Sequence, residues 1–406
     1  MNNTAQADYI GTNVFDDKRS IAYALFLALV GYAVMVAIPV ISTAWVNMLG
    51  FTEEQVGRVA GADLLGLSLG AVLTSVLVAK VNRKGLTLVG LLISIVANGL
   101  CIVVVDYEQT LWLRLVAGFA SGIFTATAIV TLGGVSKPVR AFNLLLLAFA
   151  FSTAIELHFL PKLSMAGIYW FFISLSVVCV LFLHWLPSRP QSEAELAMQE
   201  AAAAKEDGVE NWQVPKFIPF ACLFAIALTY VNIGGYFTYI ELAAHADGVA
   251  KEWVGPVLTW SSLFTIVGCV LAAMCGRLGL FKPLFIAYVL MATAVLMLGG
   301  GITNTKIAVS LFIFMAMWTF GDIFQYAMIA HMDKRGTYIA LVPSVQGFGQ
   351  FIGPNVAASI LGAGLGYNAV FIVCGLTALL ALLVYVGIFI YMHRRKLAHN
   401  EAVKTA

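Results

Sequence analysis

Twelve long apolar stretches, joined by short polar connections, make up most of this 406-residue chain. Each stretch is about as long as the roughly 20 residues that an α-helix needs to cross the hydrocarbon core of a bilayer. A polar, charged segment divides them into two sets of six. The expected spans are residues 22–46, 56–79, 86–105, 111–135, 141–163, 167–187, 217–241, 254–275, 281–301, 307–331, 339–363 and 367–392.

The length and uniformity of these stretches decide the fold class. Inside a bilayer every backbone polar group must be satisfied within the protein, which leaves helices and closed barrels. Barrel strands alternate apolar and polar residues over about 10 positions, and these stretches do not alternate. The chain is 61% hydrophobic and 11% charged, with a mean hydropathy of +0.92, which excludes a soluble globular domain. We predict an all-α membrane protein with twelve transmembrane helices in two six-helix bundles.

The basic residues predict the orientation of the chain. Cytoplasmic loops of membrane proteins are enriched in Lys and Arg. If the N-terminus is cytoplasmic, most of the 23 Lys and Arg residues fall in segments on that side. We therefore expect a multi-pass protein of a bacterial cytoplasmic or inner membrane with both termini in the cytoplasm. The expected parts are an N-terminal bundle (1–187), a cytoplasmic linker (188–215), and a C-terminal bundle with a tail (216–406).

The two halves repeat short sequence features in the same order. The segment before the second span reads Glu-Gln-Val-Gly at residues 54–57, and that before the eighth reads Glu-Trp-Val-Gly at 252–255. Ordered recurrence of this kind supports two homologous bundles. Transporters built from repeats place the solute near the midplane, where the repeats meet.

Two local patterns resemble the major facilitator superfamily. Residues 49–57 carry Leu-Gly-Phe-Thr before the second span, followed by Gln-Val-Gly. The fourth span carries Arg114, Gly118 and Gly122, which is similar to the family's Arg-x-x-x-Gly-x-x-x-Gly pattern. With the six-plus-six layout, the resemblance covers essentially the whole chain. It implies alternating access, in which two bundles rock about a central cavity.

The chain also departs from the family pattern in two places. In the segment 75–84, Ala79 stands where the family usually has an acidic residue, although the basic pair Arg83 and Lys84 remains. The resemblance implies that this pair belongs to the cytoplasmic gate. Residues 154–161 lack the Gly- and Pro-rich motif typical of drug/proton antiporters, which argues against drug efflux.

Ionisable residues inside the spans are candidate functional groups because they cost several kcal/mol to insert. Asp63, Arg114 and Glu156 fall in one outer layer of the N-terminal bundle, and Asp322 lies in the C-terminal bundle. These four residues are candidates for proton coupling or ion pairing. A carboxylate beside Arg114 stays ionised, whereas one alone in an apolar cavity can carry a proton. The alternative is a static network that locks the bundle. We expect His158 to be a core or boundary histidine.

Two sets of polar and aromatic residues recur at helical spacing and predict a cavity wall. Residues three, four and seven apart share a helix face. One set is Trp318, Asp322 and Gln325, and the other is Asn232, Tyr236 and Tyr239. These side chains could line the solute cavity, or they could form ordinary interhelical contacts.

Glycine pairs four residues apart predict close contacts between helices. They are Gly57 with Gly61, Gly66 with Gly70, Gly118 with Gly122, and Gly349 with Gly353. We also place Pro39, Pro343 and Pro354 inside helices, where they would bend them.

These features favour a transporter over an enzyme. The chain has no nucleotide-binding loop, HExxH or GxSxG motif, so we expect no catalytic residue, metal or cofactor. We predict a secondary active transporter of a small organic solute, driven by protons and monomeric in the lipid bilayer. Nucleic acid is not an expected partner, and import and export both stay open. A facilitated-diffusion uniporter and a transport-inactive sensor or partner subunit are the alternatives.

Overall fold

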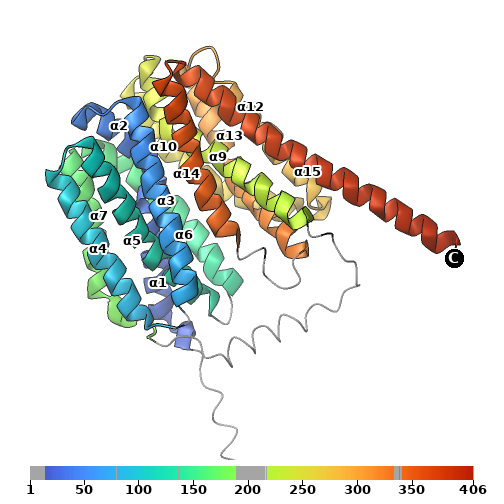
Figure 1. Cartoon of the computed structure of the whole chain (residues 1–406), viewed down its shortest axis with the longest axis horizontal. Helices are drawn as coiled ribbons and strands as arrows, with labels where there is room; N and C mark the ends of the chain where they lie inside the picture. The colour runs from blue at the N-terminus through green and yellow to red at the C-terminus, as the bar shows by residue number, and fades with distance from the viewer. Residues whose placement is uncertain are drawn as a thin grey trace, which may run out of the picture.

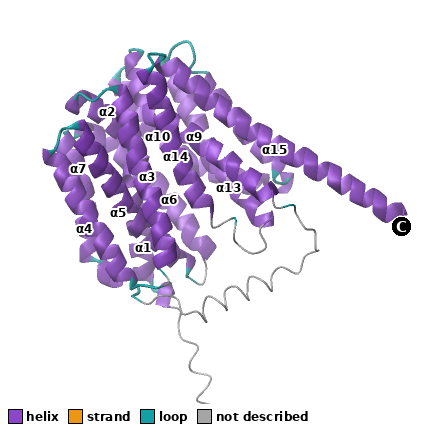
Figure 2. Ribbon diagram, viewed as in Figure 1, coloured by secondary structure: helices purple, strands orange, loops and turns teal. Residues whose placement is uncertain are grey.

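The computed structural model describes residues 14–78, 80–135, 138–188, 215, 217–332, 338 and 341–405. Within these ranges the chain forms helices and loops without a strand, as Figure 2 shows. The expected linker, 188–215, lies almost entirely outside the described residues, as does Ala79.

Seven α-helices and three short 3-10 helices form the N-terminal half (Figure 1). They are η1 (Val14–Asp16), α1 (Lys18–Val36), α2 (Ile38–Leu49), α3 (Glu53–Leu77), α4 (Arg83–Val103), α5 (Tyr107–Gly133), α6 (Pro138–Phe159), η2 (Leu160–Lys162), α7 (Met165–Leu181) and η3 (Leu183–Trp185).

Among its described residues, the C-terminal half contains α9 to α15 and the 3-10 helix η4. Its elements are α9 (Phe217–Ala246), α10 (Lys251–Ser262), α11 (Phe264–Cys275), η4 (Gly276–Leu278), α12 (Phe281–Leu296), α13 (Asn304–Met332), α14 (Val342–Gly362) and α15 (Gly366–Thr405). In the described part of the chain, nine helical segments are long and apolar enough to cross a membrane by themselves. Each of the twelve predicted stretches coincides with one helix or with two consecutive ones. The all-α membrane fold is thus confirmed.

Two of the three prolines lie at helix starts. Pro39 is in the first turn of α2, so the first predicted span is divided at Ala37 into α1 and α2. Pro343 is in the first turn of α14. The prediction of a place inside a helix is therefore wrong for both Pro39 and Pro343. A proline in a first turn removes no helical hydrogen bond, because that N–H has no partner within the helix. Pro354 lies inside α14, as predicted.

The segment 49–57 makes the turn from α2 into α3. Gly50 ends α2 with φ 72°, a left-handed conformation that favours glycine. Thr52 then caps α3: its hydroxyl accepts from the backbone N–H of Gln55 at 3.2 Å, and the Gln55 side chain accepts from Thr52 N–H at 2.9 Å. This reciprocal capping box satisfies two donors at the helix start.

The predicted glycine contacts are confirmed. Gly66 and Gly70 of α3 face the backbone of α5, where Gly118 and Gly122 face α3 in return. Gly349 and Gly353 of α14 face the α9 backbone in the same way. A Cβ at any of these positions would overlap a carbonyl oxygen of the neighbouring helix. The absence of a side chain therefore lets these helices approach closely.

The two halves meet mainly at one end of the molecule. The part of α3 that lies near α2 packs on α14. In addition, α2 packs on α9, and α10 packs on α6. In α3 the contact runs from Gly57, beside Pro354, to Ser68, beside Gly347. Beyond it, Val72, Leu73 and Val76 are exposed. Figure 1 shows α3 and α14 close together at the end near α2 and separating toward the opposite end. We refer to the end near α2 as the outer end.

We expect Gly118→Leu to destabilise the fold. The new side chain would meet the Asp63 carbonyl on α3, and overpacking of this kind costs about 1–3 kcal/mol. Thermal unfolding of the purified protein in detergent should show a lower Tm. Gly99→Leu is the matched control, because a Cβ at Gly99 on α4 meets no atom within 4 Å. Equal Tm values for the two variants would contradict the close-contact interpretation.

Candidate functional site

Asp63 and Arg114 form a buried ion pair between α3 and α5. Nε of Arg114 donates to Asp63 Oδ2 at 3.0 Å, and its Nη2 donates to the same oxygen. Nη1 donates to Asn98 Oδ1 of α4 at 2.7 Å, and the guanidinium lies 5.9 Å from the ring centre of Tyr169. Both charged residues are at most 3% exposed. Four helices of the N-terminal half thus converge on one guanidinium.

Glu156 stands apart from this pair. One carboxylate oxygen accepts from the hydroxyl of Ser152 at 2.9 Å, one turn earlier on α6. The other, Oε2, is buried and has no hydrogen-bond partner among the described residues. His158 lies on a different face, is exposed, and contacts Lys162 at 2.7 Å. Its position agrees with a boundary histidine. The three N-terminal charges therefore form one pair and one separate carboxyl group.

Asp322 is the centre of a polar and aromatic cluster in the C-terminal half. Tyr230 of α9 donates its hydroxyl to Asp322 Oδ2 at 2.7 Å, and Gln346 of α14 donates to that hydroxyl at 2.8 Å. Trp318 Nε1 points to the same hydroxyl at 3.5 Å. Gln346 also donates to Tyr326, which is 37% exposed. The second carboxylate oxygen, Oδ1, has no hydrogen-bond partner within the described part of the chain.

The Asp322 cluster lies at an accessible surface of the C-terminal half. Asp322 and Trp318 are partly exposed, and Tyr326 is exposed. The cluster thus combines a carboxylate, hydroxyl and amide groups, and aromatic rings on a partly exposed surface. Such groups can bind a polar organic molecule through hydrogen bonds and ring contacts.

Three residues of the predicted cavity wall lie inside the C-terminal half instead. Gln325 is buried and donates to Thr229 at 3.1 Å and to Tyr288. Tyr236 bonds Ser310 at 2.8 Å and lies against Phe314. Asn232 is fully buried, and neither its amide nitrogen nor its oxygen has a hydrogen-bond partner among the described residues. The structure therefore brings Trp318 and Asp322 together but separates them from the other four predicted residues.

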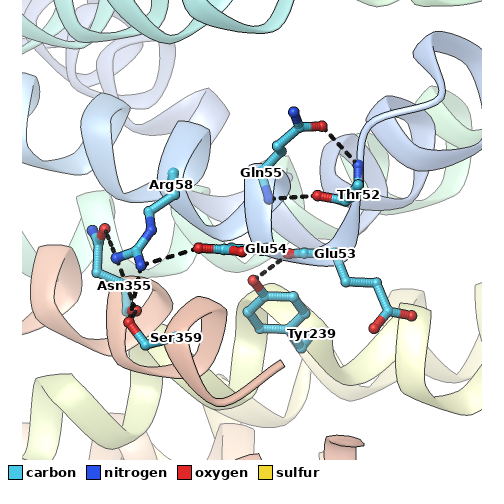
Figure 3. Close-up of polar contacts among 8 residues, drawn as sticks. All are labelled: Thr52, Glu53, Glu54, Gln55, Arg58, Tyr239, Asn355 and Ser359. Carbon is cyan, nitrogen blue, oxygen red and sulfur yellow. Dashed lines mark hydrogen bonds and ion pairs between the residues drawn. The ribbon is translucent and has the colours of Figure 1, made fainter. Parts of the chain in front are cut away.

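Tyr239 lies at the outer end, where the two halves meet (Figure 3). Its hydroxyl donates to the backbone oxygen of Glu53, the first residue of α3, at 2.7 Å. Arg58 of α3 reaches α14, where it donates to Asn355 Oδ1 at 3.1 Å and to Ser359 Oγ at 3.0 Å. We call these five residues the outer contact.

Arg58 is also held from its own helix. Its guanidinium pairs with Glu54 at 3.4 Å, one turn earlier on α3, as Figure 3 shows. This i, i+4 pair orients the guanidinium toward α14. Because the pair is partly exposed, its own contribution to stability is small.

The two predicted gate residues make contacts within the N-terminal half. Arg83 is buried, and its guanidinium lies 4.8 Å from the ring centre of Phe15. The Lys84 ammonium donates to the backbone oxygen of His184 at 3.2 Å. Asn82 caps the start of α4 just before them. Both basic residues thus fix the start of α4 to neighbouring turns of the same half.

The structure adds residues that the sequence analysis did not select. Tyr326 follows Asp322 by four positions, so helical spacing was sufficient to identify it. Tyr230, Gln346 and Asn355 lie on other helices, and no local pattern connects them to their partners. Among the described residues, no group of three His, Cys, Asp or Glu side chains could hold a metal ion.

Solved membrane transporters share this fold at low sequence identity. The nucleoside transporter NupG matches with a TM-score of 0.68 and 14% identity, over 91% of this chain and 98% of that one. A D-xylose-proton symporter matches with a TM-score of 0.70 and 13% identity, over 90% and 96%. The human organic anion transporter MFSD10 (TETRAN) matches with a TM-score of 0.65 and 14% identity, over 91% and 99%.

A family-level match covers most of the sequence. A search of curated proteins finds no match to this chain. The sequence model of the Major Facilitator Superfamily matches residues 23–354, which is well over half of the 406 residues. The match includes Glu53, Arg58 and Tyr239 of the outer contact, the Asp63–Arg114 pair and the whole Asp322 cluster. The chain belongs to the major facilitator superfamily.

Proposed function

We propose that this protein is a secondary active transporter that moves a small organic solute across the cytoplasmic membrane by alternating access, and that protons drive it. One observation carries the proposal. Two acids in the spans, Glu156 and Asp322, each have one oxygen in a hydrogen bond and one buried oxygen that no described residue contacts through a hydrogen bond. A carboxyl group with this arrangement is costly when charged and is suited to exchange a proton.

The Asp322 cluster is the proposed solute site. Its carboxylate, Tyr230, Tyr326 and Gln346 supply hydrogen-bonding groups, and Trp318 supplies a ring that can stack on an organic solute. The D-xylose-proton symporter and the nucleoside transporter with the same fold support a polar organic solute, since both names specify one. Asp322 then both binds the solute and carries a proton. Protonation of its carboxyl group changes the charge beside the solute.

The outer contact is the proposed outer gate. It joins α3 of one half to the buried Tyr239 of α9 and to the partly exposed Asn355 and the exposed Ser359 of α14. Hydrogen bonds of this kind contribute only about 0.5–1.5 kcal/mol each, so the contact can break and form during a transport cycle. The conformation described here is then closed at the outer end. Arg83 and Lys84 belong to the opposite gate, which closes in the alternate conformation.

The proposal is tested by flux measurements on the purified protein in liposomes. A thermal-shift screen against metabolites first identifies a solute that raises the Tm. An imposed pH gradient should then drive that solute across the liposome membrane. Flux that follows only the solute's own gradient would indicate a uniporter, and solute binding without any flux would indicate a sensor.

Neutral variants of the two acids test proton coupling. We expect Asp322→Asn and Glu156→Gln each to reduce pH-driven flux by about tenfold or more, because an amide cannot carry the proton. Glu108→Gln is the control, since this glutamate is exposed in the first turn of α5. The Tm of each variant reports folding. Unchanged pH-driven flux in both variants would remove these acids from the coupling mechanism.

Loss of Arg58 should open the outer gate. Arg58→Ala removes the bonds to Asn355 and Ser359, and a loss of about 1 kcal/mol would raise the proportion of open molecules about fivefold. Spin labels on Glu108 and Glu252, exposed at the outer ends of the two halves, would report a longer distance. Lys162→Ala is the control, because the interactions of Lys162 with His158 and Phe159 lie within its own half. An unchanged distance distribution in Arg58→Ala would contradict this gate.

A further inference from the structure

A stripe of exposed apolar residues on α15 leads to two arginines. Leu376, Leu380 and Leu383 are 53%, 45% and 64% exposed. They are followed at helical spacing by Gly387, by Ile390 with Tyr391, and by Arg394. These intervals of three and four residues place all of them on one face of the helix. The face is therefore apolar along the span and ends in positive charge.

The stripe ends in a shallow hollow that is open to the surroundings. Its lining residues, all on α15, are Gly387, Ile390, Tyr391, Arg394 and Arg395. Gly387 contributes to it directly, because a Cβ there would meet no atom within 4 Å. The two arginines are exposed beside it. The hollow is distinct from the Asp322 cluster and uses none of its residues.

Aromatic contacts hold this part of α15 in place. Phe389 stacks on Phe281 of α12 with 4.1 Å between ring centres, and His393 stacks on Phe389. Tyr391 meets Phe217 of α9 at 5.2 Å. Beyond these contacts α15 runs out past the body of the molecule (Figure 1). Aromatic residues are enriched where helices leave the hydrocarbon core, so the arginines lie at the level of lipid headgroups.

We propose that this hollow is a binding site for an anionic phospholipid. The arginines receive the headgroup phosphate, and the apolar stripe receives an acyl chain that enters the notch at Gly387. The part of the stripe next to the arginines has the length of a single leaflet. Leu383 and Arg394 are about 16 Å apart along the helix axis, which is close to half of the roughly 30 Å hydrocarbon core. Basic pockets between membrane helices bind anionic headgroups by the same charge complementarity.

The test compares lipids on the full-length protein after delipidation in detergent. Native mass spectrometry and thermal shift should detect phosphatidylglycerol binding well above that of phosphatidylcholine. We expect the double variant Arg394→Gln with Arg395→Gln to bind phosphatidylglycerol about thirtyfold more weakly. The control is Lys80→Gln with Arg140→Gln, which removes two exposed basic residues of the other half and should bind as the wild type does.

A second variant tests the acyl chain. Gly387→Leu has room for its side chain in the fold but fills the notch, so it should weaken phosphatidylglycerol binding while leaving the Tm without lipid unchanged. Inorganic phosphate distinguishes a free anion from a lipid: it should neither raise the Tm nor displace phosphatidylglycerol. Equal lipid binding by the arginine variant and the wild type would overturn the proposal. An equal loss in the control variant, or equal binding of phosphate, would also overturn it.

Discussion

The close packing of α3 on two sides is the constraint on which the rest of the structure depends. Gly66 and Gly70 on one face approach α5 of the same half, whereas Gly57 and Gly61 on the opposite face approach α14 of the other half. Each face carries one charged residue: Asp63 pairs with Arg114 of α5, and Arg58 bonds Asn355 of α14. The first contact is buried and the second is partly exposed. Helix α3 therefore makes a buried charged contact within its own bundle and a partly exposed one with the other bundle.

Burial and pairing separate the acids in the spans into two kinds. Removing one partner of a buried ion pair costs about 3–5 kcal/mol, because the other charge is left unpaired. Asp63 and Arg114 are therefore interpreted as a paired unit within the N-terminal half. Glu156 and Asp322 have no cationic partner among the described residues, and each leaves one oxygen without a hydrogen bond. A proton on either group changes its charge without breaking an ion pair. These two acids are thus better suited than Asp63 to carry protons.

The sequence was sufficient to predict the features that depend on local residue spacing. It was insufficient to predict side-chain contacts that depend on how each helix is rotated about its axis. Span lengths and glycine spacing predicted the helices and their close contacts, because the bilayer requires both. Spacing also grouped Gln325 with Asp322, yet Gln325 turns toward Thr229 inside the C-terminal half. A difference of three positions leaves about 60° between two side chains at 3.6 residues per turn. The bond from Arg58 to Asn355 joins residues 297 positions apart, and no local signal predicts it.

Helix α14 connects the proposed solute site to the proposed outer gate. Gln346, near its start, holds the hydroxyl of Tyr230 that donates to Asp322. Asn355, about 14 Å further along the helix, accepts from Arg58. Between them, Gly349 and Gly353 allow α14 to pack closely on α9. We therefore expect these two helices to move as one unit. Protonation of Asp322 weakens its bond with Tyr230, because a neutral carboxyl group is a poorer acceptor than a carboxylate. That change acts on both helices that hold the outer contact, and so it can bias the gate without a separate linking element.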